Sequence, residues 1–239
     1  MDKIRLLEDC LEKLNISIDE DQKSKFEKYY SLLLEKNKVM NLTRITDERE
    51  IIIKHFVDSL MICKVIEMDK VESLIDVGTG AGFPGIPIKI MWPNTKVTLL
   101  DSLDKRVGFL KEVIEELDLE GIEAVHGRAE DFGQDTNYRE QFDLCVSRAV
   151  ANLATLSEYC VPFVKDQGIF VSYKADESDE EINEAKAAIE ILGGTIENIS
   201  EEIIPGDEIK RKLVVIRKVE KTDSKYPRKA GKPSKKPLK

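Results

Sequence analysis

The sequence predicts an α/β protein with a doubly wound, mostly parallel sheet of seven strands and an N-terminal helical extension. Three observations support this prediction. Apolar residues recur at helical spacing in the first part of the chain, short apolar runs then alternate with helical segments, and a glycine-rich loop follows the first of these runs. Such alternation is typical of a sheet covered by helices on both faces.

Residues 1–66 are expected to form the helical extension, with three helices that pack on the core. Two of these helices have a recognisable start, because Ser or Asp followed three residues later by Glu has the spacing of a capping box. The two boxes are Ser17 with Glu20 and Asp47 with Glu50.

Residues 67–219 are expected to form the main domain. The connection between its last two strands, residues 205–212, is too short for a helical crossover, so these strands should pair antiparallel. The expected strands cover residues 73–77, 96–100, 123–125, 143–147, 169–173, 195–204 and 213–217, and the expected helices lie near 86–91, 105–117, 152–161 and 179–192.

The composition argues against a membrane protein and against a metal site. Charged residues make up 35% of the chain, and no apolar run approaches the roughly 20 residues of a membrane span. The first residues mix both charge signs and lack the apolar core of a signal peptide. The four cysteines lie far apart, without the spacing of metal ligands. We therefore expect a cytoplasmic monomer with free thiols, no metal and no protein partner.

Residues 220–239 differ from the rest of the chain in charge. They contain eight Lys or Arg and two acids, a net charge of +6, whereas the whole chain carries -9 and the remainder therefore -15. Their Pro- and Lys-rich composition predicts a disordered tail. The charge is compatible with a nucleic-acid-binding arm or with a solvated end that keeps the protein in solution.

The glycine-rich loop in residues 75–85, I-D-V-G-T-G-A-G-F-P-G, fits two cofactors. Read from Gly80, it matches the dinucleotide fingerprint GxGxxG; read from Asp76, it matches the acid followed by GxGxG of S-adenosylmethionine (SAM) enzymes. We favour SAM, because Asp76 at the strand end can orient the loop and face a cationic aminoacyl group. The absence of a separate substrate domain and the antiparallel last pair of strands also favour it. An NAD-dependent reductase is the minor alternative.

Further candidates for cofactor binding lie at the ends of the next strands, since ligands of doubly wound sheets bind at the carboxyl edge. Gly78, Gly80 and Gly82 permit close approach of the backbone to a ligand. Asp101 ends the second strand, where a carboxylate can accept hydrogen bonds from both ribose hydroxyls. After the third strand, a backbone amide and a side chain in residues 126–131 can bracket an adenine. Arg148 ends the fourth strand, where an anionic or nucleobase ligand would give it a partner.

Seven motifs together resemble one family. They are N-L-T-R (41–44), H-F-V-D-S-L (55–60), D-V-G-T-G-A-G-F-P-G-I-P (76–87), L-L-D-S-L-D-K-R (99–106), G-R-A-E-D (127–131), S-R-A-V-A (147–151) and Y-P-R-K-A-G-x-P (226–233). The sequence resembles the bacterial small-subunit rRNA guanine-N7 methyltransferases, also called glucose-inhibited division protein B. The resemblance implies a Rossmann-like SAM-methyltransferase fold and methyl transfer to N7 of a guanine in the decoding-region loop of 16S rRNA. It also implies SAM contacts at Gly78, Phe83, Ala129, Glu130 and Arg148.

An rRNA substrate, free or within the small ribosomal subunit, requires contacts with phosphate or bases. Taken singly, each Lys or Arg candidate between residues 44 and 174 is more often a solvated charge, and His55 is more often a structural histidine than an RNA contact. The candidates are Asn41, Arg44, His55, Lys105, Arg106, Arg128, Lys174, Arg228 and Lys229.

The expected chemistry needs no catalytic side chain. Guanine N7 has a free lone pair and no proton to lose, so holding it near the donor methyl group is sufficient. Two other functions stay open on the residues alone: a SAM-dependent methyltransferase of small molecules, and a SAM-binding RNA-binding module without turnover.

Overall fold

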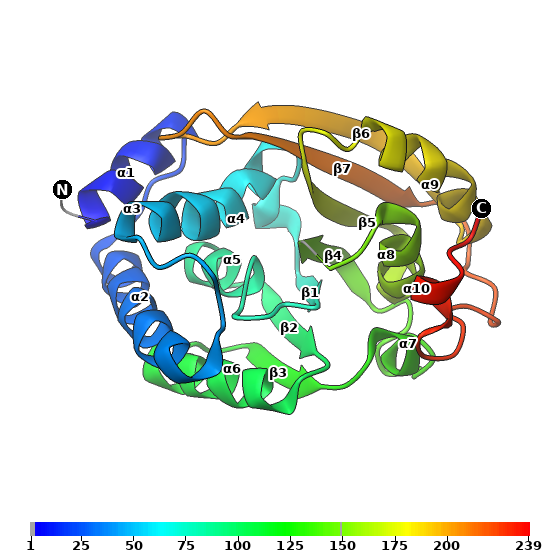
Figure 1. The fold of residues 1–239 in the computed structure, drawn as a ribbon, viewed down its shortest axis with the longest axis horizontal. Helices are drawn as coiled ribbons and strands as arrows, with labels where there is room; N and C mark the ends of the chain where they lie inside the picture. Colours follow the sequence, from blue (N-terminus) through cyan, green and yellow to red (C-terminus); the bar gives the residue numbers. More distant parts are fainter. Residues whose placement is uncertain (1–2, 149) are drawn as a thin grey trace.

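A seven-stranded sheet forms the centre of the molecule in the computed structural model, which describes residues 3–148 and 150–239. The strand order is β3-β2-β1-β4-β5-β7-β6, so the order reverses between β1 and β4 (Figure 1). The strands are β1 (Ser73–Val77), β2 (Lys96–Asp101), β3 (Ile122–His126), β4 (Phe142–Arg148), β5 (Val164–Ala175), β6 (Gly194–Ile203) and β7 (Lys210–Lys218).

The pairing confirms the predicted fold class. Strands β1 to β5 are parallel to one another, and Ile75 of β1 pairs with Thr98 of β2 and Cys145 of β4. Strand β7 is antiparallel to both β5 and β6, as the short connection before it predicted. Carboxyl ends of β1 to β4 therefore meet at one edge, and a ligand crevice is expected beside the switch in strand order.

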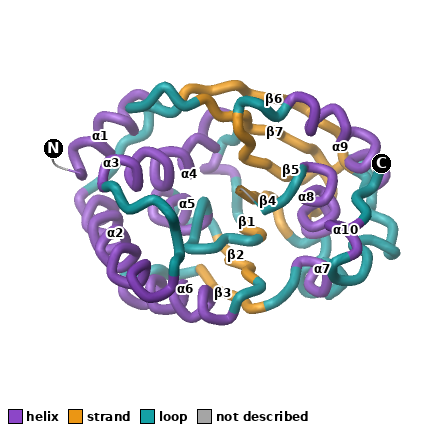
Figure 2. Tube along the Cα trace, in the orientation of Figure 1, coloured by secondary structure: helices purple, strands orange, loops and turns teal. Residues whose placement is uncertain are grey.

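Helices cover both faces of the sheet because side chains alternate along each strand. Leu74 and Leu99 belong to the core shared with the N-terminal helices, α5 and α6, whereas Ile75 and Cys145 belong to the core shared with α8 and α9. Figure 2 shows these two sets of helices on either side of the strands. The helices are α1 (Lys3–Lys13), α2 (Glu20–Met40), α3 (Glu48–Ile51), α4 (Asp58–Leu60), α5 (Gly85–Met91), α6 (Asp104–Glu116), α7 (Ala129–Phe132), α8 (Leu153–Cys160), α9 (Asp179–Ile191) and α10 (Lys232–Lys235).

The start of α2 differs from the prediction. The N-cap is Asp19 rather than Ser17: its side chain accepts the backbone N–H of Gln22, and the Gln22 side chain accepts the N–H of Asp19. This start lets the Gln22 amide group also donate to the carbonyls of Ile90 and Met91, which ties α2 to α5. At the third helical region Asp47 is the N-cap, as expected.

The C-terminal segment (residues 220–239) is packed on the domain, which differs from the disordered tail that composition predicted. Arg139 donates hydrogen bonds to the carbonyls of Thr222 and Tyr226, and Gln134 donates to those of Ser224 and Pro227. These partners precede the segment by many residues, so local composition could not reveal them. Figure 1 shows the N-terminal helices and the C-terminal segment on opposite sides of the molecule.

Within the described ranges, no helix combines the length and the apolarity that crossing a bilayer requires. Cys10, Cys63, Cys145 and Cys160 are free thiols.

Candidate functional site

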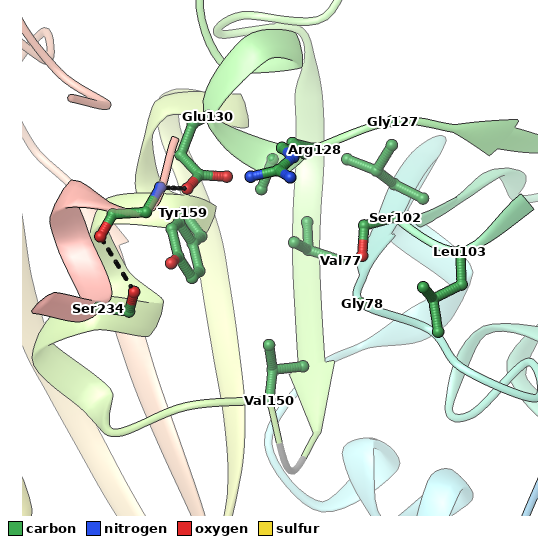
Figure 3. A pocket seen from close by; sticks show the side chains of 13 residues that line it. Val77, Gly78, Ser102, Leu103, Gly127, Arg128, Glu130, Val150, Tyr159 and Ser234 are labelled. Carbon is green, nitrogen blue, oxygen red and sulfur yellow. Dashed lines mark hydrogen bonds between the residues drawn. The ribbon is translucent and has the colours of Figure 1, made fainter. Parts of the chain in front are cut away.

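A cavity of about 370 Å³ opens at the carboxyl edge of the sheet (Figure 3). This volume lies in the range of sites for small molecules and cofactors, about 300–1,000 Å³. Its walls come from the ends of β1, β2 and β3, from Val150 after β4, from α8 and from the C-terminal segment. The lining residues are Val77, Gly78, Leu100, Ser102, Leu103, Gly127, Arg128, Ala129, Glu130, Val150, Tyr159, Gly231 and Ser234.

The glycine loop contributes Gly78, a residue without a side chain, to the lining of this cavity. Gly78, Gly80 and Gly82 have φ angles of +72°, +64° and +103°, a region that side chains disfavour. A Cβ on Gly78 would also lie 2.6 Å from a methyl carbon of Val150. Gly78 therefore meets two requirements at once, the backbone conformation and close approach to Val150.

Asp76, at the end of β1, holds the glycine loop through hydrogen bonds to two of its residues. Its carboxylate is fully buried, and Oδ2 accepts the Thr79 hydroxyl at 2.7 Å and the Gly85 N–H at 2.8 Å. Burial raises the pKa of Asp76 to about 7. The other oxygen, Oδ1, has no hydrogen-bond partner within the described residues. Asp76 does not line the cavity, so its contribution in this structure is the shape of the loop.

Asp101 also holds the loop. Its Oδ2 accepts the N–H of Gly80 and its Oδ1 accepts that of Leu103, both at 2.9 Å, and the side chain is 3% exposed. Arg106 lies 3.5 Å from Oδ2. The cavity is lined instead by the next two residues, Ser102 and Leu103.

The residues after β3 lie where the sequence placed them. Arg128, Ala129 and Glu130 line the cavity, and Glu130 is only 9% exposed. Its Oε1 accepts the N–H of Gly231 at 2.9 Å. The loop from β3 into α7 thus presents a backbone turn and a carboxylate to the same space.

Arg148 and Phe83 belong to a cluster under the N-terminal helices rather than to the lining of the cavity. Arg148 donates to Asp58 Oδ2 at 2.7 Å, and its guanidinium lies 5.3 Å from the centre of the Phe83 ring. Arg211 donates to the other oxygen of Asp58, also at 2.7 Å. Asp58 is 1% exposed, so its charge is balanced by two arginines inside the protein.

His55 stacks on the other side of this cluster. Its ring is 4.5 Å from that of Phe83, with an interplanar angle of 12°, and Nε2 lies 2.8 Å from the Thr43 hydroxyl. Burial, and then the charge of Arg148, lower the pKa of His55 to about 3, so the imidazole is neutral near pH 7. This environment is that of a structural histidine.

The remaining candidates for RNA contact fall into two groups. Lys174 donates to the Ala151 carbonyl and to Glu181, and Arg228 forms an ion pair with buried Glu158, so these two cations are engaged inside the protein. The candidates with exposed side chains are Asn41, Arg44, Lys105, Arg128 and Lys229.

Sequence reasoning did not find several lining residues. Ser102 and Leu103 directly follow Asp101, so their position in the chain was an available signal. Tyr159 reaches the cavity from α8, and nothing in its local sequence indicates this. Gly231 and Ser234 lie in the C-terminal segment, whose composition predicted disorder and gave no signal of a place in the cavity wall.

Comparisons with known proteins identify close relatives. A family model described as rRNA small subunit methyltransferase G matches residues 22–212. The chain is 56% identical to the ribosomal RNA small subunit methyltransferase G of Acetivibrio thermocellus over 223 residues, 93% of this chain and 91% of the relative. It is 49% identical to the protein of that name from Alkaliphilus metalliredigens over 239 residues, the full length of both.

Among solved structures, the chain resembles P. horikoshii TYW2 in complex with MeSAdo, with a TM-score of 0.53 and 17% identity over 68% of this chain and 62% of that chain. It also resembles a mutant of MtNAS, with a TM-score of 0.54 and 14% identity over 84% of this chain and 75% of that chain. At this identity, the two likenesses show the fold alone.

Proposed function

The chain belongs to the rRNA small subunit methyltransferase G family, and we propose that it transfers the methyl group of SAM to N7 of a guanine in the decoding-region loop of 16S rRNA. The observation that carries this proposal is the cavity at the carboxyl edge, which combines a bare glycine backbone with a buried carboxylate in a member of this family. The cofactor is SAM, since the family consists of methyltransferases that use this donor.

The lining residues fit an adenosine-containing donor. Leu103 and Val150 offer apolar surface to a base, Ser102 and Glu130 offer hydrogen bonds, and Gly78 leaves room for the ligand. When bound, SAM supplies an electrophilic methyl group on a sulfonium. We propose that Gly78, Ala129 and Glu130 contact the donor directly.

The other proposed cofactor residues act by holding these in place. Asp76 and Asp101 accept hydrogen bonds from the loop that contains Gly80 and Gly82. Phe83, in the same loop, packs against the Arg148 guanidinium. Their contribution to binding is the preorganised shape of the loop.

The acceptor nitrogen needs no general base, because guanine N7 has a lone pair and no proton. The protein's contribution is to hold N7 in line with the methyl group, which by itself lowers the barrier. His55, neutral and engaged with Thr43, is too weak a base to accept a proton near pH 7. We propose that exposed Arg44, Lys105 and Arg128 contact RNA phosphates, with Asn41 and Lys229 beside them.

We further propose that the protein acts in the cytoplasm as a monomer, because its substrate is rRNA and one chain supplies every wall of the cavity. Sedimentation of the purified protein at micromolar concentration tests the monomer, and a dimer would contradict it.

The decisive experiment incubates the protein with radiolabelled SAM and small subunits from cells that lack this enzyme, and then maps the label by mass spectrometry. We expect label on one guanine of the decoding-region loop. A matched RNA with 7-deazaguanine at that position should accept none, since N7 is replaced by carbon. Label on the 7-deaza RNA would contradict N7, and absence of label from all RNA would contradict the function. Label on a small acceptor instead, or SAM binding without turnover, would favour the two alternatives.

A further inference from the structure

The C-terminal segment supplies part of the cavity wall. Gly231 and Ser234 line the cavity, and Ser234 does so from the side opposite Leu103 (Figure 3). The Gly231 N–H donates to Glu130 Oε1 at 2.9 Å, and Figure 3 shows the second oxygen of Glu130 pointing toward Arg128. Because Gly231 fixes one oxygen, the orientation of the Glu130 carboxylate depends on the position of this segment.

Two anchors, one before and one after Gly231, hold the segment on α8. The Arg228 guanidinium donates to Glu158 through Nε at 2.8 Å and through Nη2 at 2.6 Å, and its backbone N–H donates to the same carboxylate at 2.8 Å. Glu158 is fully buried, so this pair is desolvated as well as bidentate. After Gly231, the Pro233 carbonyl accepts the Thr155 hydroxyl at 3.2 Å.

Ser234 faces Tyr159, another lining residue. Its hydroxyl donates to the Gly231 carbonyl at 3.2 Å, which closes the turn that begins α10, and both Ser234 and Tyr159 line the cavity. The segment therefore meets the cavity at two points, through an amide that orients a carboxylate and through a short side chain beside an aromatic ring.

We propose that residues 226–236 are a wall of the methyl-donor cavity, in which Gly231 positions Glu130 and Ser234 closes the side next to Tyr159. This inference rests on the proposed function, because the ligand is SAM or its product S-adenosylhomocysteine. This role is separate from the nucleic-acid-binding arm with which the charge of the segment is compatible.

The first test places a large side chain on the wall of the full-length protein. Ser234→Trp should fill the cavity and weaken S-adenosylhomocysteine binding, measured by calorimetry, by about tenfold or more. The matched control is Ser224→Trp, because Ser224 is another exposed serine of the segment and does not line the cavity. We expect its Kd to stay within about twofold of wild type, because it leaves the lining unchanged.

The second test releases the wall without filling the cavity. Arg228→Met combined with Glu158→Leu removes both charges of the anchor, so that neither is left buried alone. We expect weaker S-adenosylhomocysteine binding and faster hydrogen exchange in residues 226–236, with circular dichroism confirming that the domain is folded. Unchanged S-adenosylhomocysteine affinity in both the Ser234→Trp and the double variant would overturn the proposal that residues 226–236 form a wall of the donor cavity. Failure of the wild-type protein itself to bind would overturn the proposed donor site instead.

Discussion

Two regions cover the carboxyl edge of the sheet from opposite sides, and each is joined to the domain at a buried carboxylate. In the N-terminal helical layer (residues 3–66), Asp58 accepts hydrogen bonds from Arg148 and Arg211. In the C-terminal segment, Arg228 donates to Glu158. The surroundings differ, because Asp58 lies beside the packed rings of a large apolar core, whereas the segment is held mainly by polar bonds to backbone carbonyls.

Because of this difference, we expect the N-terminal layer to unfold only together with the core, whereas the C-terminal segment can detach from the domain without unfolding it. The rings of Phe26, Tyr29, Phe56 and Phe83 pack in succession, with neighbouring centres 5.1 to 6.1 Å apart, so the N-terminal layer cannot leave without exposing them. The C-terminal segment buries few apolar groups of its own, chiefly Tyr226, Pro227 and Pro233. Regions with few apolar contacts open at lower free energy than the core.

The largest expected effect is that of Asp58→Ala. This change leaves Arg148 and Arg211 without their carboxylate at side chains only 10% and 18% exposed, and it should lower the free energy of unfolding by about 3–5 kcal/mol. Urea denaturation followed by fluorescence measures this loss. Asp69→Ala, at an exposed acid, is the control and should leave stability nearly unchanged. A loss below about 1 kcal/mol for Asp58→Ala would mean that the Asp58 ion pairs contribute no more to stability than a pair on the surface. It would contradict an N-terminal layer that is part of the core.

Arg139→Met should have an intermediate effect that is confined to the other region. The Arg139 guanidinium donates to the carbonyls of Gly133, Thr222 and Tyr226 at 2.6 to 2.8 Å, and its loss should cost about 1–3 kcal/mol. We expect hydrogen exchange to accelerate in residues 222–228 and not in β1. Arg217→Met, which removes an arginine of β7 that donates to the Gln167 carbonyl outside the C-terminal segment, controls for the loss of a charge. Simultaneous acceleration in β1 would show that segment and core unfold as one unit.

The comparison also shows what the sequence could and could not predict. The bounds of β1 and the glycine loop were predictable, because an apolar run followed by glycines with positive φ is a local pattern. The partner of Arg148 was not, since Asp58 lies on a distant helix and only packing brings the two together. The order of the C-terminal segment was missed for the same reason: its lysines and prolines indicate disorder, and the hydrogen bonds that Arg139 donates to it and Glu158 accepts from it are long-range.

A smaller effect is expected for Tyr29→Phe, which tests whether the N-terminal layer supports the glycine loop. The Tyr29 hydroxyl donates to the Ala81 carbonyl at 2.6 Å inside the protein, and its loss should cost about 1 kcal/mol. We expect S-adenosylhomocysteine affinity to fall about two- to fivefold, as the loop loses this constraint. Tyr30→Phe is the matched control, because that hydroxyl lies 3.5 Å from Glu48 near the surface. Equal S-adenosylhomocysteine affinities for Tyr29→Phe and Tyr30→Phe would contradict a contribution of the N-terminal layer to the donor site.

The smallest effect near neutral pH is the one that His55 contributes to the pH dependence of stability. Its pKa is lowered from 6.5 to about 3, so below pH 6.5 the unfolded chain binds a proton that the folded protein does not. Stability should therefore fall as the pH decreases from 6.5 toward 3, by about 1 kcal/mol in the first pH unit. His55→Gln should remove this contribution, measured as the difference between the urea midpoints of the two proteins at successive pH values. Parallel curves for wild type and His55→Gln would contradict the buried, neutral imidazole.

The position of Gly231 and Ser234 in the chain has a consequence for biosynthesis. All seven strands precede these two residues, so a growing polypeptide contains every strand of the sheet before it contains the complete cavity. Domains form as their residues leave the ribosome, and the sheet can assemble first. Under the proposed role of this wall, a nascent chain completes the donor cavity only after residue 234 has emerged.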